Sequence, residues 1–195
     1  MTTRSATSSW TPARPRVGLG LVRRDRQRPT AVYFKDPTAS GTKVYYYRSG
    51  SAAAALSVAD VPAWRARRPA VTHVSGVTAA LSASTWELTR HVVRDRPLGP
   101  SLVSFDVNHR PSLWDTGRGP AELLDLARHS DVVFVGRDEA QTLWGTSDAE
   151  SVRDLLDGPA HVVVRTRPWR RSRSPRPGLP GARQEGHRGG RGRRR

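Results

Sequence analysis

The feature that most constrains the fold is a regular recurrence of short apolar segments from residue 71 onward. These segments begin near residues 71, 101, 131 and 161. They recur about every 30 residues, which is the size of one βαβ unit. Nearly every position in them is apolar, as in the strands of a parallel sheet that is covered on both faces. The pattern predicts an α/β fold with a mostly parallel sheet and right-handed connections.

The segments between these strands carry helix signals. Residues 82–96 are a candidate helix with Ser82 or Ser84 as its cap, and residues 119–130 place leucines at helical spacing behind a proline. Residues 138–158 predict two short helices, the second ending on Gly158.

The part of the chain before residue 71 has a different texture. Residues 30–36 and 42–50 are β-branched and aromatic around a turn sequence, which predicts a β-hairpin. Residues 17–22 are a candidate strand, and residues 51–64 are helix-permissive until Pro62 interrupts them.

The charge is concentrated at the two ends of the chain. Residues 1–30 hold seven arginines and one aspartate, and residues 166–195 hold eleven arginines and one glutamate. The 15 basic and 15 acidic residues of the segment 31–165 cancel, although the whole chain carries +16. The basicity therefore lies outside the predicted sheet, and the segment 31–165 is expected to form a neutral domain between two basic ends. Residues 1–20 are expected to be disordered or a truncated start. Residues 166–195, dense in Arg, Pro and Gly, are expected to be a disordered tail.

The composition also limits the cellular compartments in which the protein is expected. The chain has no cysteine, so neither disulfides nor zinc–thiolate sites can form. No apolar run approaches the roughly 18 residues of a membrane span, and the N-terminal residues lack the apolar region of a secretory signal. A cytoplasmic protein without a membrane partner is expected.

Polar residues stand where three of the predicted strands end. They are Ser75–Gly76, Asp106–Arg110 and Gly136–Glu139. In open parallel sheets, ligands bind outside the carboxyl ends of the strands, so these residues are expected to share one cleft. Structural alternatives stay open for each of them: Asp106 as a cap, Asn108 in an Asx turn before a proline, and Arg110 in a surface ion pair.

Several segments, in this order, resemble the ribokinase-like (PfkB) carbohydrate kinases, and within them the 2-keto-3-deoxygluconate kinase type. The segment VSFDVNHRPSLW is similar to the D-x-N-x-R-x-x-L-W motif of that subgroup. RPTAVYFKD and VYYYRSGSAA resemble its two lid strands, HVSGVTAALS its SGI segment, and DVVFVGRDEAQTLWG its Asn-x-x-Glu segment. The resemblance covers about residues 21–165.

The resemblance implies a ribokinase-like fold with flanking helices and a small β lid at about residues 30–49. It implies transfer of the γ-phosphoryl group of ATP, with Mg²⁺, to a sugar acid. The implied substrate-binding residues are Tyr33, Tyr46, Tyr47, Arg48 and Arg110. A guanidinium such as that of Arg48 suits a carboxylate because it can bind both oxygens.

Further roles are implied on the nucleotide side. Asn108, His109 and Arg110 would face nucleotide and phosphate, and Glu139 would act on Mg²⁺ through water. A second copy of the chain, forming a homodimer, is a further partner.

The chain departs from the family pattern at three places. The asparagine of Asn-x-x-Glu is replaced by Gly136, and residues 1–20 lack the Gly-Gly motif and sugar-binding Asp that precede the lid. The Gly-Ala-Gly-Asp motif, which supplies an anion hole and the catalytic base, occurs nowhere in the sequence. The fold is therefore expected to be incomplete at both ends, with no catalytic base and no kinase activity.

The composition suggests a cause for the missing motif. The chain holds 31 arginines and two lysines, as translation of a GC-rich gene would produce. Residues from about 166 onward are hypothesised to be a frameshift product.

Two alternatives remain open. The Arg-rich ends could bind nucleic acid or other polyanions nonspecifically. An intact but divergent enzyme could instead use His109 as its base.

Overall fold

The computed structural model describes residues 18–38, 41–114, 119–146 and 148–166. The predictions for the Arg-rich tail, for the frameshift, and for residues 1–17 lie outside these ranges. Polyanion binding through the two ends therefore stays a prediction.

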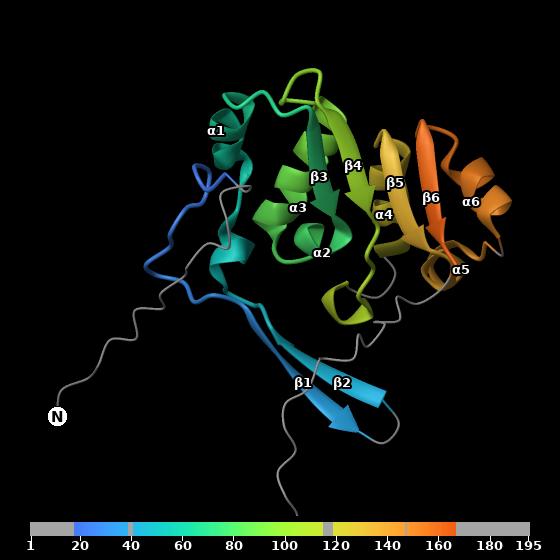
Figure 1. Cartoon of the computed structure of the whole chain (residues 1–195), viewed down its shortest axis with the longest axis horizontal. Coiled ribbons are helices and arrows are strands. Elements are labelled where there is room, and N and C mark those ends of the chain that lie inside the picture. Colours follow the sequence, from blue (N-terminus) through green and yellow to red (C-terminus); the bar gives the residue numbers. More distant parts are fainter. Residues whose placement is uncertain (1–17, 39–40, 115–118, 147, 167–195) are drawn as a thin grey trace, which may run out of the picture.

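The described chain forms a hairpin followed by alternating strands and helices (Figure 1). The strands are β1 (Val32–Thr38), β2 (Gly41–Tyr47), β3 (Val71–Ser75), β4 (Leu102–Asp106), β5 (Val132–Gly136) and β6 (His161–Arg165). The α-helices are α1 (Val61–Arg65), α2 (Gly76–Ala79), α3 (Ala83–Arg90), α4 (Gly119–Arg128), α5 (Arg137–Trp144) and α6 (Ala149–Leu156). Short turns of 3₁₀-helix precede α1 and follow β4, and a π-helical turn extends α3 to Asp95.

The four later strands form one parallel sheet in the order β3-β4-β5-β6. The predicted rhythm of strands and the α/β class are thus confirmed. The sequence offers Ser82 or Ser84 as the cap of α3, and the structure places Ser82 there, where its side chain accepts a hydrogen bond from the Thr85 amide at 3.2 Å.

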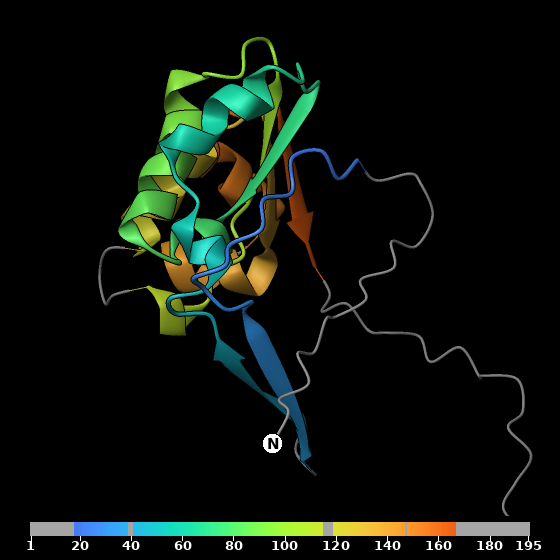
Figure 2. The same ribbon diagram turned by 90° about the vertical axis from the view of Figure 1, so that its left-hand side faces the viewer.

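The core lies on one side of this sheet. Side chains of β4 and β5, such as Phe105, Val133 and Val135, are fully buried against α4, α5 and α6. Burying each such side chain contributes about 1.5–3 kcal/mol. Figure 2 shows the helices gathered on this side of the sheet. The expectation of a sheet covered on both faces is therefore not met within the described residues.

Asp131 joins the amino ends of β4 and β5. Its carboxylate accepts hydrogen bonds from the Val103 amide at 2.7 Å and from the Arg96 guanidinium at 2.5 Å. These two donors hold the pKa of Asp131 below its usual range, chiefly through Arg96.

The hairpin of β1 and β2 is antiparallel and projects from the end of the molecule at which the sheet strands terminate (Figures 1 and 2). It confirms the two predicted strands, and their role as a lid stays a prediction. Nearly all its residues are exposed on both faces. A two-stranded ribbon of this kind is marginally stable alone in water, so it depends on what packs against it.

Three local expectations are wrong. Residues 18–22 form no strand. Pro62 lies in the first turn of α1 and breaks no helix. A proline is tolerated there because the N–H that it lacks would have no partner in the first turn. The residue that ends α6 in the left-handed conformation is Asp157 (φ 38°), not Gly158. Gly158 instead passes the backbone of Arg128 so closely that a Cβ would lie 2.3 Å from its carbonyl oxygen.

Gly76, at the junction of β3 and α2, offers a test of this packing. A Cβ there would lie 2.1 Å from the carbonyl oxygen of Val107, which belongs to the backbone and cannot rotate away. We expect Gly76→Ala to destabilise the chain by about 2 kcal/mol or more, measured as a lower urea midpoint by circular dichroism. Gly18→Ala, where a Cβ meets nothing within 4 Å, is the control and should change the midpoint little. Equal midpoints for the two variants would contradict the packing at Gly76.

Candidate functional site

The carboxyl ends of β4, β5 and β6 meet around a pocket of about 490 Å³. The loop after β4, the start of α5 and the end of β6 line it. Its residues include His109, Arg110, Glu139 and Arg165. The structure therefore brings His109 and Arg110 together with Glu139, which the strand-end pattern places in one cleft. The pocket also takes in Arg165 from β6, whereas Ser75 and Gly76 at the end of β3 do not line it.

Glu139 is the centre of this arrangement. Its carboxylate accepts a hydrogen bond from the His109 amide, in the loop after β4. It also accepts one from the Gly136 amide, at 3.0 Å, where β5 passes into α5. One side chain in the first turn of α5 thereby ties two strand ends together.

Arg165 adds a positive charge from the third strand. Its guanidinium lies 3.6 Å from the Asp106 carboxylate and 3.9 Å from that of Glu139. The Asp106 oxygen is buried and has no hydrogen-bond partner among the described residues. The sequence analysis did not select Arg165. The sequence does contain a signal for it. Arg165 is the last residue of the fourth apolar segment, the same position at which polar residues follow the other strands.

Asn108 links the site to the β3 end of the sheet. Its side-chain amide donates to the Ser75 hydroxyl over 3.2 Å, and its backbone is left-handed with φ 40°. Asparagine tolerates this conformation better than most residues, but it still stores backbone strain of the kind found at functional positions.

His109 and Arg110 differ in how they are held. Partial burial lowers the pKa of His109, and Arg110 lowers it further, whereas Glu139 opposes the shift. Arg110 is exposed, and its guanidinium donates to the carbonyl of His109 at 2.8 Å. The Arg110 charge is thus free to face an anion.

The predicted tyrosines lie on two different faces of the hairpin. Tyr33 and Tyr46 pair across the two strands with ring centroids 6.1 Å apart, and the Arg48 guanidinium lies 3.9 Å from the centroid of Tyr46. Tyr47 lies on the opposite face, where its ring meets Phe34 edge-on at 5.7 Å. Three of the four predicted lid residues therefore form one group, and Tyr47 belongs to another surface.

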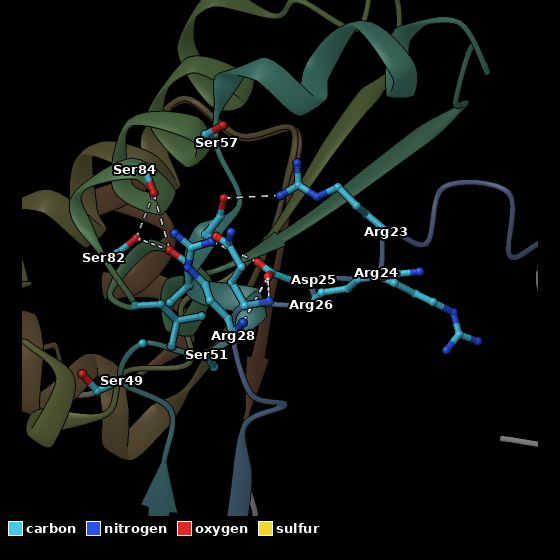
Figure 3. A pocket seen from close by; sticks show the side chains of 15 residues that line it. Arg23, Arg24, Asp25, Arg26, Arg28, Ser49, Ser51, Ser57, Ser82 and Ser84 are labelled. Atoms are coloured by element: carbon cyan, nitrogen blue, oxygen red, sulfur yellow. Dashed lines mark hydrogen bonds and ion pairs between the residues drawn. The ribbon is translucent and has the colours of Figure 1, made fainter. Parts of the chain in front are cut away.

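A larger pocket, of about 850 Å³, begins at Ser49, directly after Arg48 (Figure 3). It is lined by the segment 23–28, the end of the hairpin and the start of α3. Two of its arginines are already paired, Arg23 with Asp60 at 2.8 Å and Arg28 with Asp25 at 3.0 Å. None of the predicted site residues lines this pocket, and its ion pairs fix the segment that leads into β1.

Within the described residues, no cluster of three or more His, Asp or Glu side chains is placed to hold a metal ion. Among the helices of the described ranges, none combines the length and apolar character that crossing a membrane requires.

Comparison with known proteins identifies relatives of this arrangement. The pfkB family of carbohydrate kinases matches residues 16–166. The 2-dehydro-3-deoxygluconokinase of Bacillus subtilis is 34% identical over 149 residues, which are 74% of this chain and 46% of that protein. The crystal structure of a PfkB protein from Polaromonas sp. JS666 is 34% identical, with a TM-score of 0.64 over 72% of this chain and 49% of that one.

A fructokinase from Xylella fastidiosa, solved with bound ATP, shares the fold at 23% identity and a TM-score of 0.61, over 73% of this chain and 45% of that one. The chain thus spans about half the length of the relatives it matches.

The environment of His109 predicts a measurable titration. Because the folded chain binds the imidazole proton more weakly than the unfolded chain does, His109 should titrate below its ordinary pKa of 6.5. The unfolded state then takes up more protons as the pH falls through 6.5, so stability decreases there and is regained at higher pH. NMR titration of the His109 ring, assigned with His109→Gln, measures this pKa. A value at or above 6.5 would contradict the burial.

Proposed function

Because the chain belongs to the pfkB family of carbohydrate kinases, we propose that its described part forms the binding wall of an ATP-dependent sugar-acid kinase. The proposed substrate is 2-keto-3-deoxygluconate (2-dehydro-3-deoxygluconate) or a similar sugar acid. The name of the Bacillus subtilis relative supports this choice, as does that of the Thermoproteus tenax 2-dehydro-3-deoxygluconokinase. We propose that residues 21–165 form a partial kinase domain.

The convergence of three strand ends on one pocket is the observation that carries the proposal. Arg110 and Arg165 supply two guanidiniums there, which suit the oxygens of ATP phosphates. Asn108 and His109 lie beside them in the loop after β4, with a carboxamide and an imidazole that can hydrogen-bond to nucleotide or substrate.

The hairpin supplies the other side of the proposed site. Arg48 is the group for the substrate carboxylate, and its contact with the Tyr46 ring restricts the directions in which it can point. Tyr33, on the same face, adds a phenol that can hydrogen-bond to sugar hydroxyls.

The residues at the pocket fit a magnesium ion that keeps several of its water ligands. Mg²⁺ keeps several of its waters and is commonly bound through one or two carboxylates and substrate phosphates. The buried Asp106 oxygen accepts no hydrogen bond among the described residues and lies 3.6 Å from the Arg165 guanidinium, so it could accept one from such a water. Glu139 lies 3.9 Å from the same guanidinium. When bound, the ion would neutralise the negative charge of the phosphates.

Phosphoryl transfer itself is not part of the proposed activity. Transfer depends on positioning and on stabilisation of charge. The Gly-Ala-Gly-Asp segment that supplies the anion hole and base in this family is absent from the sequence. The proposal is therefore binding of ATP and sugar acid without turnover. The frameshift hypothesis is tested at the DNA level, where a shifted frame near codon 166 should encode this motif.

The face of the hairpin that carries Phe34 supports a second proposal, a homodimer. Phe34, Tyr45 and Tyr47 are exposed on that face, away from Arg48 and Tyr46. An exposed aromatic patch of this kind marks a contact surface for protein.

Nucleotide binding tests the proposal directly. Isothermal titration of the full chain with ATP and Mg²⁺ should show one site, and Arg165→Ala should weaken it about tenfold because a charge-assisted contact is lost. Arg90→Ala, an exposed arginine at the end of α3, is the matched control and should leave the affinity unchanged. No detectable binding, or equal weakening by both variants, would contradict the proposal.

A coupled assay with 2-keto-3-deoxygluconate and ATP separates binding from catalysis. We expect no turnover above background. Clear turnover would show that the inactivity proposal is wrong, and its loss in His109→Gln would favour the alternative in which His109 acts as the base.

A further inference from the structure

The pocket of about 850 Å³ lies at the base of the hairpin and takes no part in the proposed kinase function (Figure 3). Its walls come from three parts of the chain. They are the segment 23–28, which leads into β1, parts of the segment 49–57, which follows β2, and the residues at the start of α3. Pockets of about 300–1,000 Å³ are of the size that small ligands occupy. A ligand there would touch both ends of the hairpin and the body of the molecule.

The pocket wall carries positive charge that is only partly balanced. Two of its four arginines, Arg23 and Arg28, are each paired with an aspartate. The guanidiniums of Arg24 and Arg26 make no ion pair or hydrogen bond within the described residues, and both residues are exposed. Two positive charges are therefore left over, and they match the charge of about −1.5 to −2 that a phosphate group carries at neutral pH.

Serine hydroxyls add neutral hydrogen-bonding groups to the same wall. Ser51 is 1% exposed, and its Oγ has no hydrogen-bond partner among the described residues. Buried polar groups are nearly always hydrogen-bonded, so a hydroxyl without a partner in a pocket wall points to a ligand. Ser82 and Ser84 stand at the start of α3, and the N-terminus of a helix favours a negative charge.

A cation or an uncharged molecule fits these groups less well than an oxyanion does. Asp25 is the one carboxylate among the described residues that line the pocket. It already accepts the amides of Gln27 and Arg28, at 2.9 and 3.1 Å, and the Arg28 guanidinium. An uncharged ligand would leave the two remaining guanidinium charges unmatched. Guanidinium groups bind phosphate oxygens through paired, charge-assisted hydrogen bonds, so the wall suits a phosphate group.

The same pocket is the place where the hairpin is attached. The Ala52 amide donates to the Pro29 carbonyl at 2.9 Å and so joins the two ends of the hairpin. The Ser82 hydroxyl donates to the Ala54 carbonyl at 2.7 Å and joins the second end to α3. Because nearly all residues of the two strands are exposed, the hairpin depends on such contacts at its base. An anion between the walls would add further contacts there.

We propose that this pocket binds a single phosphate group, either free or carried by a sugar, and that the bound phosphate holds the base of the hairpin against α3. Arg24 and Arg26 supply the charge, and Ser51 supplies a buried hydrogen bond. The inference does not depend on the proposed kinase function, because no residue proposed for ATP or sugar acid lines this pocket. A failure of ATP binding would leave it standing.

The test needs a signal from the pocket itself, because arginines elsewhere in the chain also attract phosphate. NMR of the full chain is titrated with inorganic phosphate, glucose 6-phosphate and glucose at constant ionic strength. The backbone amides of Ser51 and Ala52 should shift with the two phosphates and not with glucose. Inorganic phosphate that binds at least as tightly as glucose 6-phosphate identifies the free ion as the ligand, and tighter binding of glucose 6-phosphate identifies a sugar phosphate. Hydrogen exchange of the Ala52 amide should slow on binding.

Paired substitutions test the residues of the wall. Arg24→Ala with Arg26→Ala should raise the half-saturating phosphate concentration at least about tenfold, because charge-assisted contacts are lost. Arg65→Ala with Arg90→Ala is the control, since it removes two exposed arginines outside the pocket and gives the same net charge. It should change this concentration less than about twofold. Ser51→Ala should weaken binding while the urea midpoint stays the same or rises, because a buried hydroxyl without a partner is removed.

Several results would overturn the proposal. One is the absence of shifts at Ser51 and Ala52 with millimolar phosphate, or equal shifts with glucose. Another is equal weakening by the two arginine pairs, since attraction by the charge of the whole chain would then account for binding. A lower urea midpoint with unchanged binding in Ser51→Ala would assign this hydroxyl to the fold alone. Binding without slower exchange at Ala52 would show that the anion does not hold the hairpin. Circular dichroism of each variant shows whether it remains folded.

Discussion

The carboxylate of Glu139 is the constraint on which the candidate site depends. Its two oxygens accept hydrogen bonds from the backbone amides of His109 and Gly136. The Arg165 guanidinium lies 3.9 Å from one of them. Without these contacts the loop after β4 and the start of α5 would leave backbone N–H groups without partners at the edge of the sheet. The pocket therefore has its shape in the free chain, before any ligand is bound.

A second constraint is the direction in which the chain crosses the sheet. Because β3 to β6 are laid down in order, the same handedness that builds the helical core leaves the other face without a layer. The core of Phe105 with Leu123, Leu126 and Leu156 is fully buried, so the folded half has an interior of its own. The helical core on one face of the sheet and the absence of described helices from the other thus have the same topological cause.

Much of the fold could be predicted from periodicity. Valine-rich runs at a spacing of about 30 residues and leucines at helical spacing are local signals, and they located β3 to β6 and α3 to α6. The errors came from signals whose meaning depends on tertiary context. Pro62 is compatible with either a break or a helix start, and Gly158 is required by the approach of the Arg128 carbonyl, which no local pattern reveals. For the site, strand ends predicted the cluster. The face on which Tyr47 lies and the reach of Arg165 required the strand register.

The hydrogen exchange of two backbone amides tests the organisation of this edge most directly. In the native chain the amides of His109 and Gly136 should be protected, because both donate to Glu139. In Glu139→Ala this protection should disappear at both amides, while the amides of β4 keep theirs. Protection that survives the substitution would show that Glu139 does not hold the site. A loss that spreads through β4 would assign it to the whole fold instead.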